Sequence, residues 1–195
     1  MSRDETRRPG RRRDQQAHQE ILEATVHLLR DVGYQRLSID AVAARAGVAK
    51  TTVYRWWANK AALVVEALET ALNLPSPQPT GDSRTDIRAV VQRIADTFGA
   101  PPLGEVLPAL AVDLSRDPDA QARLRTMLGP RRAANAAILL AAAGRRDLPP
   151  DVDVHLLLDM VAGAILYRSL LGRAPTTALV DQLTDFILGT NLPRT

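Results

Sequence analysis

The stretch SIDAVAARAGVAKTTVYRWWANK, residues 38–60, decides the fold of the amino-terminal third of the chain. Ser38 can cap the free backbone amides of a helix that follows it, and Asp40 lies in the first turn, where the helix dipole favours a negative charge. This pattern predicts a short helix over 39–46. Gly47 ends it, because a sharp turn needs a positive backbone angle that glycine adopts at low cost. A second short helix follows the turn.

The two short helices have an inward apolar face and an outward polar face. Ala43 is small enough for the helices to approach closely, and the inward positions are Val42, Ala46, Val48 and Val53. The outward face of the second helix, expected over 49–56, carries hydrogen-bond donors suited to phosphates and base edges: Lys50, Thr51, Thr52, Tyr54 and Arg55. This pattern is typical of a helix-turn-helix, whose second helix enters the DNA major groove.

A longer amphipathic helix is expected on each side of the motif. The first begins at Asp14 and is stopped by Gly33, which acts as a left-handed cap. The second is capped by Asn59 and runs to about Leu74. The run PSPQPTG over 75–81 cannot continue a helix and marks a domain boundary.

Beyond this boundary every periodic segment is helical, with no strand pattern and no internal repeat. Pro130 lies within the third of these segments and predicts a kink, or a break after Gly129. The sequence therefore predicts an all-α chain with an amino-terminal three-helix DNA-binding domain and a carboxy-terminal helical domain. The carboxy-terminal helices are expected over 83–98, 103–116, 118–143, 151–172 and 176–189.

The expected organisation is a basic arm without fixed structure over 1–13, the helix-turn-helix domain over 14–60, a connecting helix and linker over 61–81, and a helical domain over 82–195. Residues 1–60 carry 12 Lys and Arg against 7 Asp and Glu, whereas the rest carries 13 against 15. A basic first third indicates a polyanionic partner. The arm is open to two interpretations, a solubility tail or a DNA contact.

Composition excludes several classes of protein. The chain has no cysteine, which rules out a disulfide framework, a thiolate metal cluster and a cysteine nucleophile. Its longest stretches without a charge are about twelve residues, whereas a membrane span needs roughly eighteen. No apolar core of a signal peptide follows the basic start. We therefore expect a cytoplasmic protein with no membrane partner.

Histidines are the only candidates for a metal ligand or catalytic base. His18 and His27 are expected to be exposed helix residues, and His155 has Asp151 and Asp159 at helical spacing. Acidic residues also match the dipole in a first helical turn, which favours a structural role. There is no phosphate loop, HExxH or GxSxG motif. We expect no enzyme, no metal and no cofactor; an enzyme on a helical scaffold would depend on His155 or Asp159.

The spacing of residues around the motif resembles the DNA-binding domain of the tetracycline-repressor (TetR) family over about residues 15–72. In that family a first helix ends in Gly-aromatic, followed by Ser or Thr, Ala-x-x-x-Gly-Val, Tyr-x-x-aromatic and Lys. The corresponding residues here are Gly33-Tyr34, Ser38, Ala43 to Gly47-Val48, Tyr54 to Trp57, and Lys60. Beyond residue 81 the resemblance is architectural.

The resemblance implies a role for each matched polar residue. Ser38 and Tyr54 contact phosphates, and Lys50 and Thr51 stand at the leading end of the recognition helix. Lys60 contacts a phosphate at the start of the following helix, and a helix amino terminus with a lysine is also an anion site on physical grounds.

The chain departs from the family pattern at Ala49, where a hydroxyl residue is usual. The cap and its phosphate contact are then absent, and recognition depends more on the lysine, threonine and arginine of the same helix. Trp57 is expected in the core, and Trp56 partly exposed near the DNA.

For the carboxy-terminal domain, the resemblance implies a small-molecule cavity and a dimer interface on the last two helices. Two apolar stripes support the interface independently. An apolar effector is the simplest guess for the cavity. The candidate cavity residues are Phe98, Leu107, Leu110, Leu124, Met127, Leu128 and Tyr167, and the candidate dimer residues are Leu158, Ala162, Ile165, Ser169, Leu179, Leu183, Phe186 and Ile187.

The implied function is a homodimeric regulator that binds a near-palindromic operator and represses transcription until a small-molecule effector binds. The alternative is a sequence-tolerant, nucleoid-like DNA-binding protein without an effector. Such a protein binds DNA with a steep dependence on salt and little preference between sequences.

Overall fold

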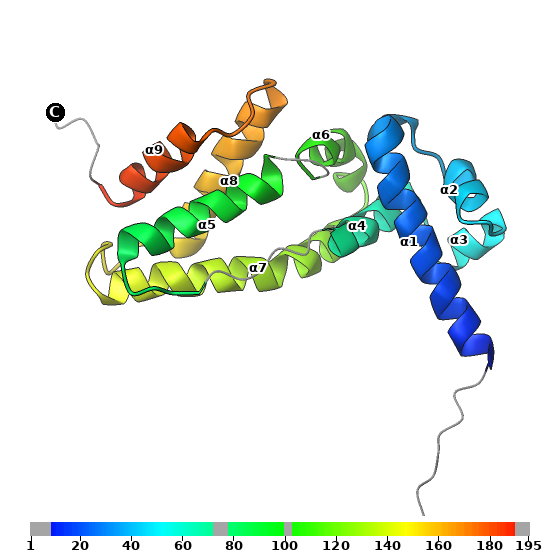
Figure 1. The fold of residues 1–195 in the computed structure, drawn as a ribbon, viewed down its shortest axis with the longest axis horizontal. Helices are drawn as coiled ribbons and strands as arrows, with labels where there is room; N and C mark the ends of the chain where they lie inside the picture. The colour runs from blue at the N-terminus through cyan, green and yellow to red at the C-terminus, as the bar shows by residue number, and fades with distance from the viewer. Residues whose placement is uncertain (1–8, 72–77, 100–102, 190–195) are drawn as a thin grey trace, which may run out of the picture.

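The computed structural model describes residues 9–71, 78–99 and 103–189, and its regular elements over these ranges are all helices (Figure 1). The predicted all-α class is confirmed. The helices are α1 (Pro9–Arg36), α2 (Ile39–Arg45), α3 (Lys50–Trp56), α4 (Lys60–Ala71), α5 (Ser83–Phe98), α6 (Leu103–Leu114), α7 (Pro118–Gly144), α8 (Val154–Leu170) and α9 (Thr177–Ile187).

Two helix boundaries differ from the sequence prediction. The first helix begins at Pro9, so it extends into the segment expected to be an arm, whereas residues 1–8 lie outside the described ranges. Gly33 leaves helical geometry with φ of +74°, as predicted, but one more helical turn follows it to Arg36. The expected end of the fourth helix at Leu74 also lies outside the described residues.

The predicted break at Pro130 is wrong, because α7 is one helix from Pro118 to Gly144. Its first half packs against α4 and its second half against α5 and α8. Burial on both halves outweighs the local penalty of a proline inside the helix, as tertiary packing often does.

The helices are arranged as two groups joined by the long α7 (Figure 1). The helix-turn-helix formed by α2 and α3 lies against α1 at one end of the molecule. At the other end α5, α8 and α9 pack together over the second half of α7. The start of α7 reaches back to α4, which itself packs on α1.

Buried apolar residues form two cores that do not follow the order of the chain. The first core combines α1 to α4 with α6 and the start of α7, including Leu110 and Met127. The second combines α5, α8 and α9 with the second half of α7. Phe98 packs against both cores. The unit of α1 to α4 therefore shares its core with two helices of the carboxy-terminal domain.

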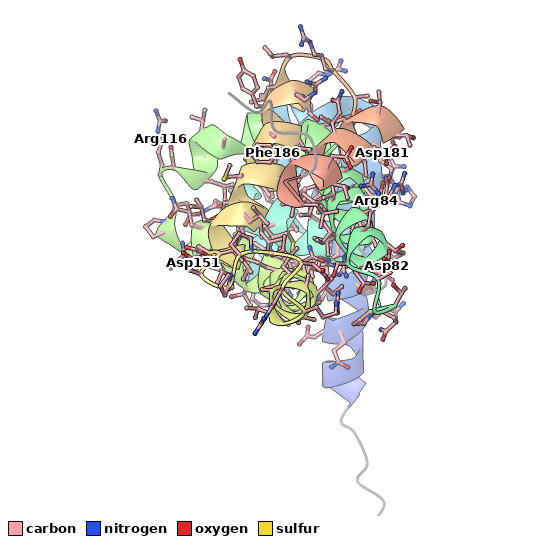
Figure 2. The ribbon with its side chains drawn as sticks, turned by 90° about the vertical axis from the view of Figure 1, so that its left-hand side faces the viewer. Asp82, Arg84, Arg116, Asp151, Asp181 and Phe186 are labelled. Atoms are coloured by element: carbon pink, nitrogen blue, oxygen red, sulfur yellow. The ribbon has the colours of Figure 1, made fainter. Side chains whose placement is uncertain are left out.

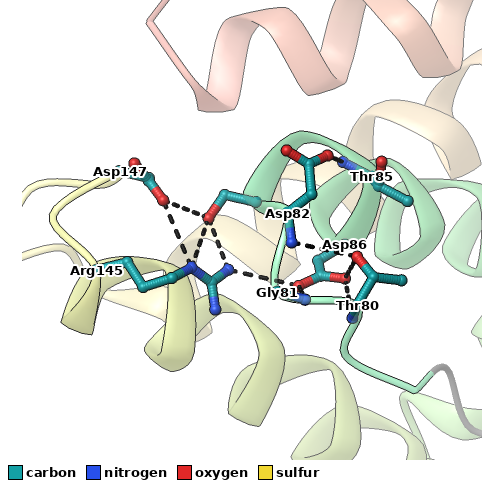
Figure 3. Close-up of polar contacts among 8 residues, drawn as sticks. Thr80, Gly81, Asp82, Thr85, Asp86, Arg145 and Asp147 are labelled. Atoms are coloured by element: carbon teal, nitrogen blue, oxygen red, sulfur yellow. Dashed lines mark hydrogen bonds and ion pairs between the residues drawn. The ribbon is translucent and has the colours of Figure 1, made fainter.

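A polar network fixes the start of α5 against the end of α7 (Figure 3). Asp82 caps the helix by accepting a 2.8 Å hydrogen bond from the backbone N–H of Thr85. Asp86 is 2% exposed and accepts bonds of 2.7 Å from both the backbone N–H and the hydroxyl of Thr80. Arg145 lies 3.4 Å from its other oxygen. The backbone bond from Thr80 is the main reason that the pKa of Asp86 lies below its usual value.

We predict that Asp86→Asn destabilises the protein at neutral pH by about 1–3 kcal/mol, because buried donors lose a charged acceptor. The folded-state pKa of Asp86 is depressed, so its contribution is present above the unfolded pKa of about 3.9 and is lost as pH falls through the folded value. Urea unfolding of both proteins from about pH 7 to about pH 3 measures this difference.

The matched control is Asp96→Asn, an exposed carboxylate on the same helix. It should leave stability nearly unchanged. A stability difference between wild type and Asp86→Asn that stays constant over the whole pH range contradicts the prediction.

Candidate nucleic-acid interface

The turn between α2 and α3 has the geometry that the sequence predicts. The hydroxyl of Ser38 accepts a 3.2 Å bond from the N–H of Ala41 and caps α2. Gly47 has φ of +65°, and the N–H of Val48 donates to the carbonyl of Ala43 at 3.0 Å. No atom beyond Gly47 and its two chain neighbours lies within 4 Å of the place where a Cβ of Gly47 would stand, so the backbone angle and not crowding requires glycine there.

The inner faces of α2 and α3 are fixed by burial. Val42 and Val53 are fully buried and Trp57 is 1% exposed, which confirms these three predicted core positions. Ala46 and Val48 pack partly buried against the same core. Because these contacts fix the rotation of α3 about its axis, its outer face points to solvent in one orientation.

The predicted DNA-contacting residues stand mainly on this outer face. Five of them are exposed: Ser38, Lys50, Thr51, Tyr54 and Arg55; Thr52 is half-buried. The side chain of Ala49 makes no capping bond, as the sequence predicts. Trp56 is 39% exposed, which confirms its predicted partial exposure.

Both exposed cations of α3 are paired with carboxylates of the same chain. Lys50 Nζ lies 2.7 Å from Asp40 Oδ1, and this bond raises the pKa of Lys50. Arg55 Nη2 lies 2.8 Å from Asp14 Oδ1. Solvent screens pairs this exposed, so they contribute little to stability and a DNA phosphate can replace either carboxylate at little cost. The sequence predicts Asp14 and Asp40 only as residues that start helices, and not as partners of these cations.

The side chain of Lys60 binds other groups of the same chain. Its Nζ donates to the carbonyl of Tyr34 at 3.1 Å and lies 4.1 Å from the centre of the Tyr34 ring. The lysine is half-buried at the start of α4 and ties that helix to the end of α1. For Lys60 to contact a phosphate as predicted, its ammonium group would have to leave the carbonyl of Tyr34 or donate to both groups.

Glu66 on α4 links three elements that are distant in sequence. It accepts a 2.8 Å bond from the indole N–H of Trp57, and its other oxygen lies 3.0 Å from His18 Nε2. Arg123 of α7 reaches the carboxylate at 3.5 Å. The His18 ring stacks on Trp57 with centroids 4.8 Å apart. His18 is thus half-buried and not the exposed residue predicted, and no sequence motif had indicated Glu66.

Two more hydrogen bonds join the DNA-binding unit to the carboxy-terminal helices. The buried hydroxyl of Tyr34 donates to Asp113 on α6, and burial together with this bond raises the pKa of Tyr34. Asn59 Nδ2 donates to Asp117 Oδ2 at 2.6 Å. Both bonds span more than fifty residues of sequence, which explains why sequence patterns do not reveal them.

A cavity of about 180 Å³ lies between α5, α7 and α8 in the carboxy-terminal domain. Phe98 and Leu128 of the predicted ligand residues line it. The other five lie elsewhere: Leu107, Leu110 and Met127 are buried in the first core, Leu124 packs against that core, and Tyr167 is 63% exposed. The cavity also has polar lining residues, including Arg93 and Asn135, that the sequence did not single out.

Four of the predicted dimer residues, Leu158, Ile165, Leu179 and Ile187, are at most 9% exposed because they pack in the core of their own chain. Ala162, Ser169 and Leu183 are half-buried, and Phe186 is 47% exposed. Figure 2 looks onto α8 and α9, with Phe186 labelled on α9. The exposed apolar residues of α8 are instead Leu156, Met160, Tyr167 and Leu170.

The acidic residues near His155 have structural partners. Asp153 caps α8 by accepting the N–H groups of His155 and Leu156, and Asp159 pairs with Arg132 at 2.5 Å. Within the described residues no group of three or more His, Cys, Asp or Glu could hold a metal ion. Across residues 9–71, 78–99 and 103–189, no helix combines the length and apolar character that a membrane span requires.

Two family models match the chain. The model of bacterial regulatory proteins of the tetR family matches residues 21–67, which contain the helix-turn-helix. The model of the tetracyclin repressor-like carboxy-terminal domain matches residues 77–187.

Relatives and solved structures agree with these matches. The uncharacterized HTH-type transcriptional regulator YdeS of Bacillus subtilis is 34% identical over 83% of this chain and 82% of its own. The DNA-binding transcriptional repressor TetR of Mycobacteroides abscessus is 34% identical over 83% and 85%. The crystal structure of the TetR family transcription regulator SCO0332 superposes with a TM-score of 0.68, at 33% identity, over 91% of this chain and 99% of that one. The chain therefore belongs to the TetR family of helix-turn-helix transcriptional regulators.

Proposed function

We propose that the protein is a homodimeric repressor that binds a near-palindromic operator in the cytoplasm and leaves it when a small molecule binds the carboxy-terminal domain. The observation that carries the proposal is the outer face of α3, where Lys50, Thr51, Tyr54 and Arg55 stand exposed on a scaffold fixed by burial. The sign of regulation follows the relative from Mycobacteroides abscessus, whose name describes a repressor.

Dimerisation accounts for the exposed apolar face of α8. Leu156, Met160, Tyr167 and Leu170 recur every three to seven residues along the helix and are 49–63% exposed. Such a stripe on a surface helix is typical of a packed partner. A second copy of the chain is the occupant we propose, because a two-fold axis through this stripe also presents two recognition helices to a two-fold-symmetric site.

Ligand release requires that the effector prefer the conformation that does not fit DNA. The two recognition helices must enter successive major grooves, about 34 Å apart or at a multiple of that spacing. The fourth helix is packed between α1 and α7, so a shift of α7 moves it together with the DNA-binding unit. A small tilt then changes the separation of the recognition helices.

We predict that Lys50→Ala and Thr51→Ala each weaken operator binding by about 1–3 kcal/mol, because both remove contacts of the recognition helix to specific DNA. Binding to random DNA of the same length should change less. Footprinting on the DNA flanking the gene supplies the operator, and titration of labelled duplexes gives the affinities.

The control is Arg125→Ala, which removes an exposed cation of α7 outside the motif and should leave operator affinity unchanged. Equal losses on operator and random DNA for both α3 variants, with a steep salt dependence, would favour the nucleoid-like alternative over a sequence-specific repressor.

We predict that Met160→Glu converts the protein to monomers, because it places a charge in the centre of the apolar stripe of α8. Sedimentation velocity measures the assembly state, and operator affinity should fall with it. The matched control is Val112→Glu, an exposed apolar residue on α6 that is 58% exposed. If Met160→Glu stays dimeric, the interface lies elsewhere.

A further inference from the structure

The cavity between α5, α7 and α8 has a mixed lining. Apolar side chains such as Ile94, Phe98 and Leu128 form most of it. At about 180 Å³ it is slightly larger than an apolar cavity of about 150 Å³ that holds benzene. It therefore fits a compact molecule of one ring or a short branched chain.

Arg93 on α5 lines this cavity and is 8% exposed. Its Nε and Nη1 atoms are buried without a hydrogen-bond partner. Asn135 on α7 lines the same cavity, is 6% exposed, and has an unpartnered Oδ1. Turning its amide over would present the N–H₂ donors instead. Buried guanidinium groups nearly always have hydrogen-bond acceptors, so one without acceptors in the protein indicates a ligand that supplies them.

The charges around the cavity leave Arg93 without an anion. The carboxylate of Asp159 is held by Arg132 at 2.5 Å, and Arg132 also donates to the carbonyl of His155 at 2.9 Å. The other charged residue of the lining is Arg131, a second cation. Burial and the charge of Arg131 both lower the pKa of Arg93. Arg93 is therefore a buried cation without an anion at a largely apolar site.

We infer that this cavity binds a compact organic carboxylate, with its carboxylate on Arg93 and Asn135 and its apolar body against Ile94, Phe98 and Leu128. A guanidinium donates two parallel N–H bonds to a carboxylate, a geometry that a neutral ligand cannot match. The effect of the carboxylate on operator binding rests on the proposed function. Its binding to the cavity does not. It also replaces the apolar effector that the sequence favoured.

The position of the cavity gives the ligand a route to the DNA-binding unit. Phe98 lines the cavity and packs against both cores, and Leu128 lines it and packs against the first core. The first core contains α4 and the helix-turn-helix. A ligand that displaces these two side chains acts directly on the packing that holds α4 against α7.

The test uses sodium benzoate, phenylacetate and 3-methylbutanoate, each with its uncharged amide, on the full-length protein. Calorimetric titration and thermal unfolding measure binding. At least one carboxylate should bind and raise the unfolding temperature, while its amide does not. In Arg93→Met the affinity for that carboxylate should fall by about tenfold or more. The control Arg88→Met, on the same helix but paired with Asp181 at 2.7 Å, should bind as wild type does.

A second measurement separates a ligand site from a structural role. Arg93→Met should raise the unfolding temperature of the ligand-free protein, because it replaces an unpaired buried charge by an apolar side chain of similar length. A lower unfolding temperature overturns the inference. So does binding of the amides as tightly as the acids, the absence of binding by all three carboxylates, or tight binding by Arg93→Met.

Operator titration in the same samples distinguishes this inference from the proposed function. If the wild-type protein binds its operator normally but binds none of the three carboxylates, the anion site alone is overturned. A carboxylate that binds through Arg93 but leaves the operator occupied supports the anion site and contradicts ligand release.

Discussion

The burial of α4 on nearly all sides is the constraint on which the rest of the structure depends. Seven of its twelve residues are buried, and they face α1 and α7 as well as α6. A helix that buries apolar residues on most of its sides cannot shift without its neighbours. Any movement of α7 is therefore passed to α4, and from α4 to α1 and the helix-turn-helix. The DNA-binding unit of this chain has no separate core that could move independently.

Polar contacts fix the relative positions of helices that pack through their apolar side chains. Glu66 accepts from Trp57 through Oε2, which also faces Arg123, and its Oε1 faces the imidazole of His18. Tyr34 makes a parallel connection to α6 through Asp113. Hydrogen bonds of this kind tolerate much smaller displacements than hydrophobic contacts do. The helices α1, α4, α6 and the start of α7 are thus held in one arrangement unless several bonds change together.

The helix-turn-helix was largely predictable from sequence, because its signals are local: a cap at Ser38, a glycine at position 47 and apolar residues at helical spacing. The carboxy-terminal site was not. Which face of α8 is buried depends on α5 and α7, so a periodic stripe of leucines could not be assigned to core or surface from its own segment. The buried guanidinium of Arg93 looked like any helix arginine, because its lack of a partner exists only in three dimensions. The predicted break after Gly129 is wrong for a related reason, since packing at both ends of α7 outweighs a local rule.

The ion pairs of the recognition helix affect how the protein searches a chromosome. Asp40 and Asp14 occupy the cations of α3 in the same manner as phosphate oxygens. On arbitrary DNA, each contact with the backbone first has to displace an internal carboxylate, which reduces the gain from sequence-independent attraction. The same exchange would precede backbone contacts on the operator, so the two carboxylates would weaken attraction to any DNA alike and shorten residence on random sites.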